Sequence, residues 1–213
     1  MTTREPVLST VAIAELRPTQ ITVGFREVAE KRREWRERSE KSPKKAARYL
    51  GSHMVPAVLG PGDRPYLVDH HHLALALHEE GQKEVLINVL TDLSSLSKAA
   101  FWTYMDNRAL CHPYDAAGKR RDYADLPKRI AELADDPYRS LAGELRRVGG
   151  FAKDTTPFNE VLWADFLRPR VKTKLITEHF SASLEKALAL AKSEAAAYLP
   201  GWCGPHTDDG AST

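Results

Sequence analysis

The chain has 213 residues, 42% of them hydrophobic, which suffices for one well-buried core and a second small helical unit but not for two large domains. Its 31 Lys and Arg residues against 29 Asp and Glu residues leave a net charge of only +2, which excludes a strong overall field toward DNA or an acidic membrane. Any nucleic-acid binding must therefore come from a local patch.

Cysteine usage and hydropathy indicate a soluble cytoplasmic protein. Cys111 and Cys203 lie far apart in the sequence, in no CxxC or Cys/His spacing typical of zinc sites or redox pairs. No apolar run approaches the roughly 20 residues that a membrane-spanning helix needs, and the first ten residues lack the apolar centre of a signal peptide. We expect no contact with a membrane.

The first part of the chain alternates strands and helices. Residues 11–16 suggest a short strand followed by a loop. Residues 27–50 are rich in helix formers and alternating charges, and Pro43 divides them into two helices. The word "GPGD" between two apolar runs predicts a hairpin, and residues 84–90 predict a buried strand.

The stretch "LVDHHHLALALHEEG", residues 67–81, predicts a helix that begins at three histidines. Asp69 is a good N-cap, the leucines supply apolar positions, and Gly81 is a C-terminal stop. Strand, helix and strand in this order make a small α/β unit, so the fold class expected is α/β.

After residue 96 the sequence favours helices almost throughout. They are expected at residues 97–109, 127–134, 137–148, 157–167 and 171–198. We therefore expect an α/β domain over residues 1–96, a helical extension packed on it over residues 97–200, and a flexible tail over residues 201–213.

The three histidines are candidates for a metal site, a phosphate site or a plain polar helix start. Successive helical residues point about 100 degrees apart, so adjacent histidines cannot converge on one ion. The first helical turn exposes backbone N–H groups and a partial positive charge, to which His71 and His72 can add donors for a phosphate. A polar helix start that binds nothing remains the alternative.

Several longer words resemble one known family. They are "VPAVLGPGDRPYLVDHHHLALAL", "FWTYMDNR", "HPYDAAGKRRDYADLPK", "DDPYRSLAGELRRVGGFAK" and "PFNEVLWADFLR". Together, from about Leu16 to Arg170, they resemble the ParB-like nucleases of the ParB/sulfiredoxin superfamily. The resemblance implies a compact α/β fold whose helix start after the hairpin holds nucleotide phosphates, with Asp69, His70, His71 and His72 at that position.

This chain departs from the superfamily's word at two positions of the helix start. The superfamily commonly has a Gly, a Cys or His, a His and an Arg there; His70 replaces the Gly and Leu73 replaces the Arg. One expected phosphate anchor is thus missing. His71 stands where sulfiredoxins keep a catalytic Cys, which argues against a sulfinic-acid reductase.

The resemblance also implies a catalytic carboxylate before the hairpin. In kinase-like relatives a Glu from the early loop and helix acts as the base, and Glu27 is the candidate here, with His71 as a second catalytic candidate. Lys31 lies one turn after Glu27 and can share its helix face, where its ammonium group can offset phosphate charge. An ordinary charged helix face is the alternative.

Two further groups of polar residues are candidates for phosphate binding. In "HPYDAAGKRRDYADLPK", Lys119 and Arg120 can bind phosphate and Asp115 can hold Mg²⁺, although such a loop can simply be solvated. Cations that can line a nucleic-acid groove, or simply face water, are Arg139, Arg146, Arg147 and Lys153. The aromatic side chains that we expect in the core are Phe101, Trp102, Tyr104, Trp163 and Phe166.

The functional hypothesis is phosphate-ester chemistry on a nucleotide such as ATP or ADP, or on nucleic acid, with Mg²⁺ as a candidate cofactor. One alternative is a small-molecule kinase that phosphorylates a free amino acid. The other is a module that binds a nucleotide or a partner without catalysis. No DNA-reading helix-turn-helix is identified, so base-specific recognition is not expected.

Overall fold

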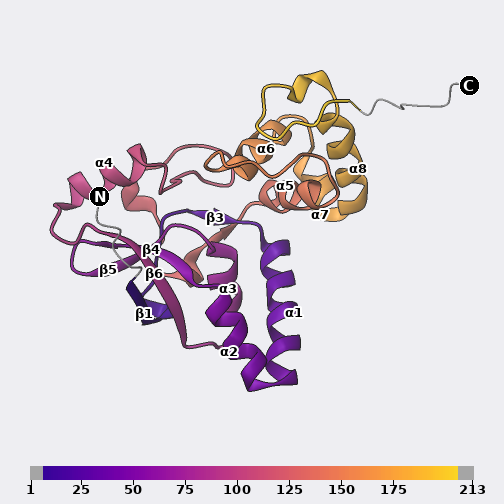
Figure 1. Ribbon diagram of the computed structural model, residues 1–213. Helices are drawn as coiled ribbons and strands as arrows, with labels where there is room; N and C mark the ends of the chain where they lie inside the picture. The colour runs from indigo at the N-terminus through magenta and orange to yellow at the C-terminus, as the bar shows by residue number, and fades with distance from the viewer. Residues whose placement is uncertain (1–6, 206–213) are drawn as a thin grey trace, which may run out of the picture. The chain divides into compact units, whose positions relative to one another are not determined.

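The computed structural model describes residues 7–205 as two compact units that divide between Asp135 and Asp136 (Figure 1). The first unit extends past the boundary expected at residues 96–97 and includes the helix and loops that follow it. A flexible tail was expected over residues 201–213, and residues 206–213 of it lie outside the described residues. Its first residue, Gly201, is bonded to the rest of the second unit, because its carbonyl accepts from the Ala152 N–H at 2.7 Å.

A mixed five-stranded sheet organises the first unit. Its spatial order is β1 (Val7–Ala12), β6 (Glu84–Asp92), β4 (Val55–Gly60), β5 (Arg64–Leu67) and β2 (Arg17–Pro18). β1 and β5 run antiparallel to their neighbours β6 and β4, whereas the β4–β6 and β2–β5 pairs are parallel. The hairpin and the strand expected at residues 84–90 are confirmed, and the fold class is α/β as expected.

The strand expected at residues 11–16 lies earlier in the chain than predicted. β1 ends at Ala12, and Ile13–Glu15 form a 3-10 turn instead. Leu16 is fully buried after that turn. The apolar residues that suggested a strand are therefore buried in the core, but their backbone forms a turn. The hairpin turn holds Gly62 and Asp63 at positive φ, which explains why its sequence is rich in glycine.

Two helices lie side by side next to the sheet, α1 (Phe25–Lys41) and α3 (His71–Glu79) (Figure 1). α2 (Pro43–Ser52) follows α1 after the expected break, and Ser42 Oγ caps it by accepting from the Lys44 N–H at 3.2 Å. α3 carries buried residues on nearly its whole circumference, so it forms the centre of this core.

A second cluster in the first unit surrounds α4 (Lys98–Asn107), capped by Ser97. Phe101, Trp102 and Met105 are buried there, as expected for the first two, whereas Tyr104, also expected in the core, is only partly buried. The helix expected at residues 127–134 is wrong. Residues Ile130–Glu132 form a 3-10 turn, and Ala134–Asp135 form β7, which pairs in parallel with β3 (Thr22–Val23).

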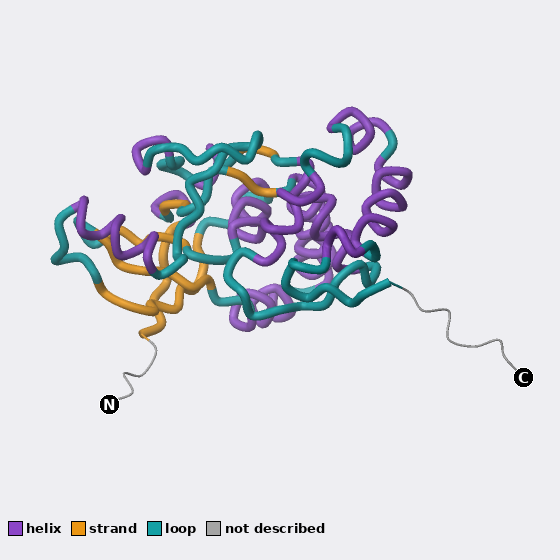
Figure 2. Tube along the Cα trace, turned by 90° about the horizontal axis from the view of Figure 1, so that it is seen from above, coloured by secondary structure: helices purple, strands orange, loops and turns teal. Residues whose placement is uncertain are grey.

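The second unit is helical and has its own core. Its helices are α5 (Pro137–Arg147), α6 (Asn159–Leu167), α7 (Thr173–Glu178) and α8 (Phe180–Ala191), followed by a 3-10 turn at Glu194–Ala196. The single helix expected at residues 171–198 is therefore wrong, because the chain breaks at His179 (φ −138°, ψ 62°). All strands of the described residues lie before Asp136 in the chain; Figure 2 colours them orange and the helices purple.

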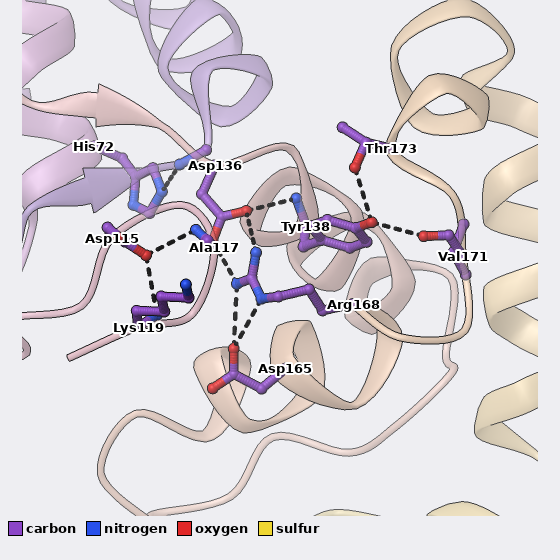
Figure 3. Close-up of polar contacts among 11 residues, drawn as sticks. His72, Asp115, Ala117, Lys119, Asp136, Tyr138, Asp165, Arg168, Val171 and Thr173 are labelled. Atoms are coloured by element: carbon purple, nitrogen blue, oxygen red, sulfur yellow. Dashed lines mark hydrogen bonds and ion pairs between the residues drawn. The ribbon is translucent and has the colours of Figure 1, made fainter.

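A buried ion pair joins α5 to α6 within the second unit. Arg168 Nη2 lies 2.8 Å from Oδ2 of Asp136, a carboxylate only 2% exposed, and also contacts Asp165 at 3.2 Å (Figure 3). Asp136 in turn caps α5 through the Tyr138 N–H at 3.0 Å. Trp163 and Phe166 are buried in this core, as expected.

No helix within residues 7–205 is long and apolar enough to cross a membrane.

Candidate functional site

The starts of α1 and α3 meet through the side chain of His72. Its Nε2 accepts a hydrogen bond from the Gly24 N–H at 2.9 Å, drawn in Figure 3. Because a backbone N–H only donates, Nε2 carries no proton and the ring proton is assigned to Nδ1. The same Nε2 lies 3.6 Å from Oε2 of Glu27. His72 thus joins the start of α3 to Gly24 at the start of α1, and because its Nε2 carries no proton, that nitrogen donates no hydrogen bond to the nearby Glu27 carboxylate.

Glu27 contacts Lys31 on its other side. Its Oε1 lies 3.5 Å from Lys31 Nζ, which confirms the shared helix face expected from their spacing. The Glu27 side chain is 20% exposed and that of Lys31 is 30% exposed, so both can meet a ligand from solvent. We call Glu27, Lys31 and His72 the Glu27 cluster.

His71 points into the protein. It is 2% exposed, and its Nε2 accepts from the Thr19 N–H at 3.2 Å. Thr19 Oγ1 lies 3.5 Å from the same nitrogen and donates to the Leu67 carbonyl at 2.7 Å. The His71 imidazole thus joins the start of α3 to the loop after β2, and its burial leaves it poorly placed to exchange protons with a substrate.

His70, and not Asp69, is the N-cap of α3, so the cap expected at Asp69 is wrong. His70 has left-handed backbone angles (φ 64°, ψ 25°), while the Asp69 Oδ1 accepts only from the neighbouring His70 N–H, at 2.6 Å. The resemblance places Gly at this position, and the left-handed conformation is the physical reason for that preference.

The His70 ring adds no positive charge to the site. Burial lowers its pKa, since a charged imidazole is disfavoured away from water, and the nearby Lys31 and His53 lower it further against the opposing effect of Asp69. The His70 imidazole is therefore neutral at pH 7. Lys31, whose charge acts on His70, is a formal cation near this helix start.

Asp115 organises the loop that follows α4. Its Oδ1 accepts from the N–H groups of Ala117 and Lys119, each at 2.9 Å (Figure 3), and its Oδ2 accepts from Arg121 Nε at 2.7 Å. The Lys119 N–H, followed by Arg121 and Ala117, lowers the Asp115 pKa. With its oxygens bonded to N–H donors, this carboxylate is a poor ligand for Mg²⁺.

Arg120 is engaged by a carboxylate, whereas the Lys119 side chain is exposed. Arg120 Nη2 lies 2.5 Å from Asp106 Oδ2, and the Tyr123 hydroxyl donates to the same oxygen at 2.6 Å. This contact with Arg120 lowers the Asp106 pKa, and in return the pKa of Arg120 is raised. Arg120 would have to leave Asp106 to bind a phosphate.

The loop containing these residues begins next to the helix starts. The His112 N–H donates to the Thr19 carbonyl at 2.7 Å, and Thr19 itself contacts His71. Of the residues expected at the site, the structure brings Glu27, Lys31 and His72 together. It gives the side chains of His71, Asp115 and Arg120 other partners.

Thr19, Gly24 and Glu80 position the site although the sequence pattern did not single them out. Glu80 Oε1 accepts from Arg32 Nε at 2.6 Å and its Oε2 from Arg36 Nε at 2.5 Å, which ties α1 to the end of α3. Hydrogen bonds from Arg36, and then from Arg32, lower the Glu80 pKa to about 2. Each partner lies more than 40 residues away, so no local spacing indicates it.

The described residues contain no group of three or more His, Cys, Asp or Glu side chains arranged to hold a metal ion. Of the four cations expected to line a groove, Arg146 and Arg147 pair with carboxylates, whereas Lys153 is exposed. Arg146 Nε lies 2.8 Å from Glu160, and Arg147 Nη1 lies 3.2 Å from Glu144. Arg139 is buried.

Comparison with solved structures finds a relative of known fold. The crystal structure of protein Atu1540 from Agrobacterium tumefaciens is 54% identical in sequence and superimposes with a TM-score of 0.87. The match covers 94% of this chain and 98% of that one. No curated protein matches the chain.

Comparison with family models finds one whose description is "Putative ParB-like nuclease", matched over residues 9–169. The match spans all of the sheet except the first two residues of β1, and it includes the Glu27 cluster, the loop of Asp115 and the first two helices of the second unit. It confirms the resemblance expected from the sequence, and the chain belongs to the ParB-like nuclease family.

Proposed function

We propose that this protein binds the phosphate groups of a nucleotide or a nucleic acid at the start of α3 and acts on a phosphate ester beside Glu27. The observation that carries the proposal is the position of the Glu27 carboxylate, 3.6 Å from His72 Nε2 and 3.5 Å from Lys31 Nζ. Membership of the ParB-like nuclease family supports the same chemistry.

Each member of the Glu27 cluster has a separate role in the proposal. The Glu27 carboxylate accepts a proton from the attacking water or hydroxyl group, and the Lys31 ammonium group offsets charge that develops on the phosphate. The backbone N–H groups at the start of α3 bind phosphate oxygens. His72 fixes the start of α1 next to the start of α3 by accepting from the Gly24 N–H.

The residues outside the cluster support binding. His71 acts as a positioning residue through Thr19, which keeps the first turn of α3 in place. Asp69 and His70 shape the turn before that helix. Lys119 is exposed and can contribute a cation to a phosphate that extends beyond the cluster.

The first experiment compares Glu27→Gln with Glu37→Gln, an exposed position on the same helix. Each protein is assayed for nicking of supercoiled plasmid and for hydrolysis of ATP and ADP, with and without Mg²⁺ or Mn²⁺. Loss of a general base predicts a rate reduction of about 100-fold or more in Glu27→Gln. Glu37→Gln keeps the wild-type rate. Equal rates in the two variants would remove Glu27 from the mechanism.

The same geometry fits a second reaction, transfer of a phosphate to a small acceptor. Glu27 stands where the resemblance places the base of kinase-like relatives, and its exposed face can meet an acceptor hydroxyl. A kinase consumes ATP or ADP only when an acceptor such as free serine is present, and it yields the phosphorylated acceptor in equal amount. Nucleotide binding by calorimetry without turnover in any assay would support the binding module instead.

A further inference from the structure

A pocket in the first unit gathers four cations that are far apart in the sequence. Arg17 from β2, Arg64 from β5, Lys98 from the start of α4, and Lys128 from the segment before β7 all line it. No Asp or Glu side chain is among the described residues that line the pocket. With a net charge of only +2 on the whole chain, such a gathering is a local field that favours an anion.

The pocket wall is held in place by the chain itself. Arg17 Nη1 donates to the Lys128 carbonyl at 2.7 Å, which fixes the segment before β7 against β2. Two carboxylates contact residues of the wall: Glu132 Oε2 accepts from the Lys128 N–H at 2.9 Å, and Asp106 accepts from the Tyr123 hydroxyl at 2.6 Å. The Asp106 charge is balanced by Arg120.

Aromatic rings form the other part of the wall. Tyr66 and Trp102 meet edge to face with ring centres 5.4 Å apart, and Trp102 stacks on Tyr123 at 5.4 Å with an angle of 9° between the planes. Rings beside cations suit a ligand that carries an apolar ring or sugar next to its phosphate. Inorganic phosphate would use only the cations.

The Trp102 side chain supplies an independent sign of a ligand. The residue is 6% exposed, and its indole N–H is buried with no acceptor among the described groups. A buried donor without a partner is costly, and most find one. Trp102 lines the pocket, so a ligand oxygen becomes the acceptor if the indole ring turns toward it on binding.

We infer that this pocket, the Arg17 pocket, binds the phosphate and sugar of a nucleotide unit. The unit can be a free nucleotide or part of a single-stranded nucleic acid, since both present the same chemistry. The inference extends the proposed function with a second phosphate-binding surface. It is tested by binding alone, so its failure and the failure of catalysis at Glu27 are distinguishable.

The experiment measures fluorescence anisotropy of labelled oligothymidylate of about 10 nucleotides, without divalent ions. The pocket variant is Lys98→Gln with Lys128→Gln; the matched control is Lys44→Gln with Lys45→Gln, two exposed lysines on α2. We expect Kd to rise about tenfold in the pocket variant only. The slope of log K against log salt should fall by about 1.4, because each phosphate contact on a single strand contributes about 0.7.

A Trp102→Phe variant tests the buried donor, since it keeps an aromatic ring and removes the indole N–H. We expect Kd to rise about fivefold, the value of one hydrogen bond, in a protein whose circular dichroism is unchanged. Displacement by dTMP identifies a free nucleotide as a sufficient ligand; its failure with retained oligonucleotide binding identifies the polymer.

Three results would overturn the inference. The first is equal Kd for the pocket variant and the control. The second is displacement of the oligonucleotide by polyglutamate as effectively as by unlabelled DNA, because it would show that charge alone is recognised. The third is no binding of oligonucleotide or dTMP by the wild-type protein at low salt.

Discussion

His70 holds a left-handed backbone conformation at the junction between the hairpin and α3. For residues other than glycine this conformation costs about 1–2 kcal/mol, and histidine tolerates it better than β-branched residues do. The strain lies directly before the turn that presents His71 and His72. The positive φ therefore limits which residues can replace His70, whatever their side chains.

We predict that His70→Gly is more stable than His70→Ala by about 1 kcal/mol, because both lose the ring but only glycine adopts positive φ without strain. Urea unfolding of the two variants measures the difference. An alanine variant that equals or exceeds the glycine variant would contradict the role given to the backbone.

The two cysteines differ in their surroundings. Cys111 is buried, and burial, with a smaller effect of the Asp106 charge, raises its pKa to about 12, whereas Cys203 is exposed. The thiolate is the reactive form, so we predict that iodoacetamide at pH 8 modifies Cys203 and spares Cys111 in the folded protein. Peptide mass spectrometry locates the label. Urea should make both thiols reactive, and rapid labelling of Cys111 without urea would contradict its burial.

At the scale of elements, the site depends on how α1 lies against α3. His72 joins their N-terminal ends through Gly24, and Glu80 joins the last residues of α3 to Arg32 and Arg36 of α1. The two connections flank the apolar contact between the helices, so a change at Glu80 acts on the angle and spacing of α1. Glu27, on the same helix, would shift with it.

We predict that Glu80→Gln lowers the melting temperature by a few degrees at pH 7 and not at pH 2. The folded pKa of Glu80, about 2, lies below its ordinary value of 4.5, so the carboxylate stabilises the fold above about pH 4.5 and this contribution is lost as the pH falls toward 2. Thermal unfolding at both pH values measures the change. Glu79→Asp serves as the milder control, because Glu79 also contacts Arg32, at 2.8 Å.

At the scale of the whole molecule, charge is balanced and binding must be local. The chain carries a net charge of +2, and the ion pairs of α1, α5 and α6 use many of its cations. The four cations of the Arg17 pocket come from segments far apart in the sequence, and the tertiary structure brings them together.

We predict that the affinity for single-stranded DNA falls with salt with a slope no steeper than about 3 on a logarithmic plot, the value for four phosphate contacts of about 0.7 each. Anisotropy titrations over a series of salt concentrations measure it. A much steeper slope would mean that cations outside the Arg17 pocket contribute, and a slope near zero would mean that phosphates are not bound there.

The local sequence pattern was sufficient to predict the elements that are stabilised by interactions between residues close together in the chain. The Pro43 break, the "GPGD" hairpin and the apolar strand at residues 84–90 all appear where the sequence predicted them, because turns, caps and burial periodicity act within a few residues. The spacing of Glu27 and Lys31 likewise predicted their contact on one helix face. Long words shared with a known family indicated the family.

Long-range contacts accounted for the rest. Asp69 looks like an N-cap, but the chain entering from β5 turns at His70, which is the N-cap instead. Residues 127–134 do not form the predicted helix, and the segment ends in β7, which pairs with β3. The sequence alone thus predicted the α/β class, the hairpin and helix start, and the Glu27–Lys31 pair. The tertiary structure placed His72 against Gly24 and Glu27, buried His71 against Thr19 and collected the cations of the Arg17 pocket, because those partners come together only when segments distant in the chain pack.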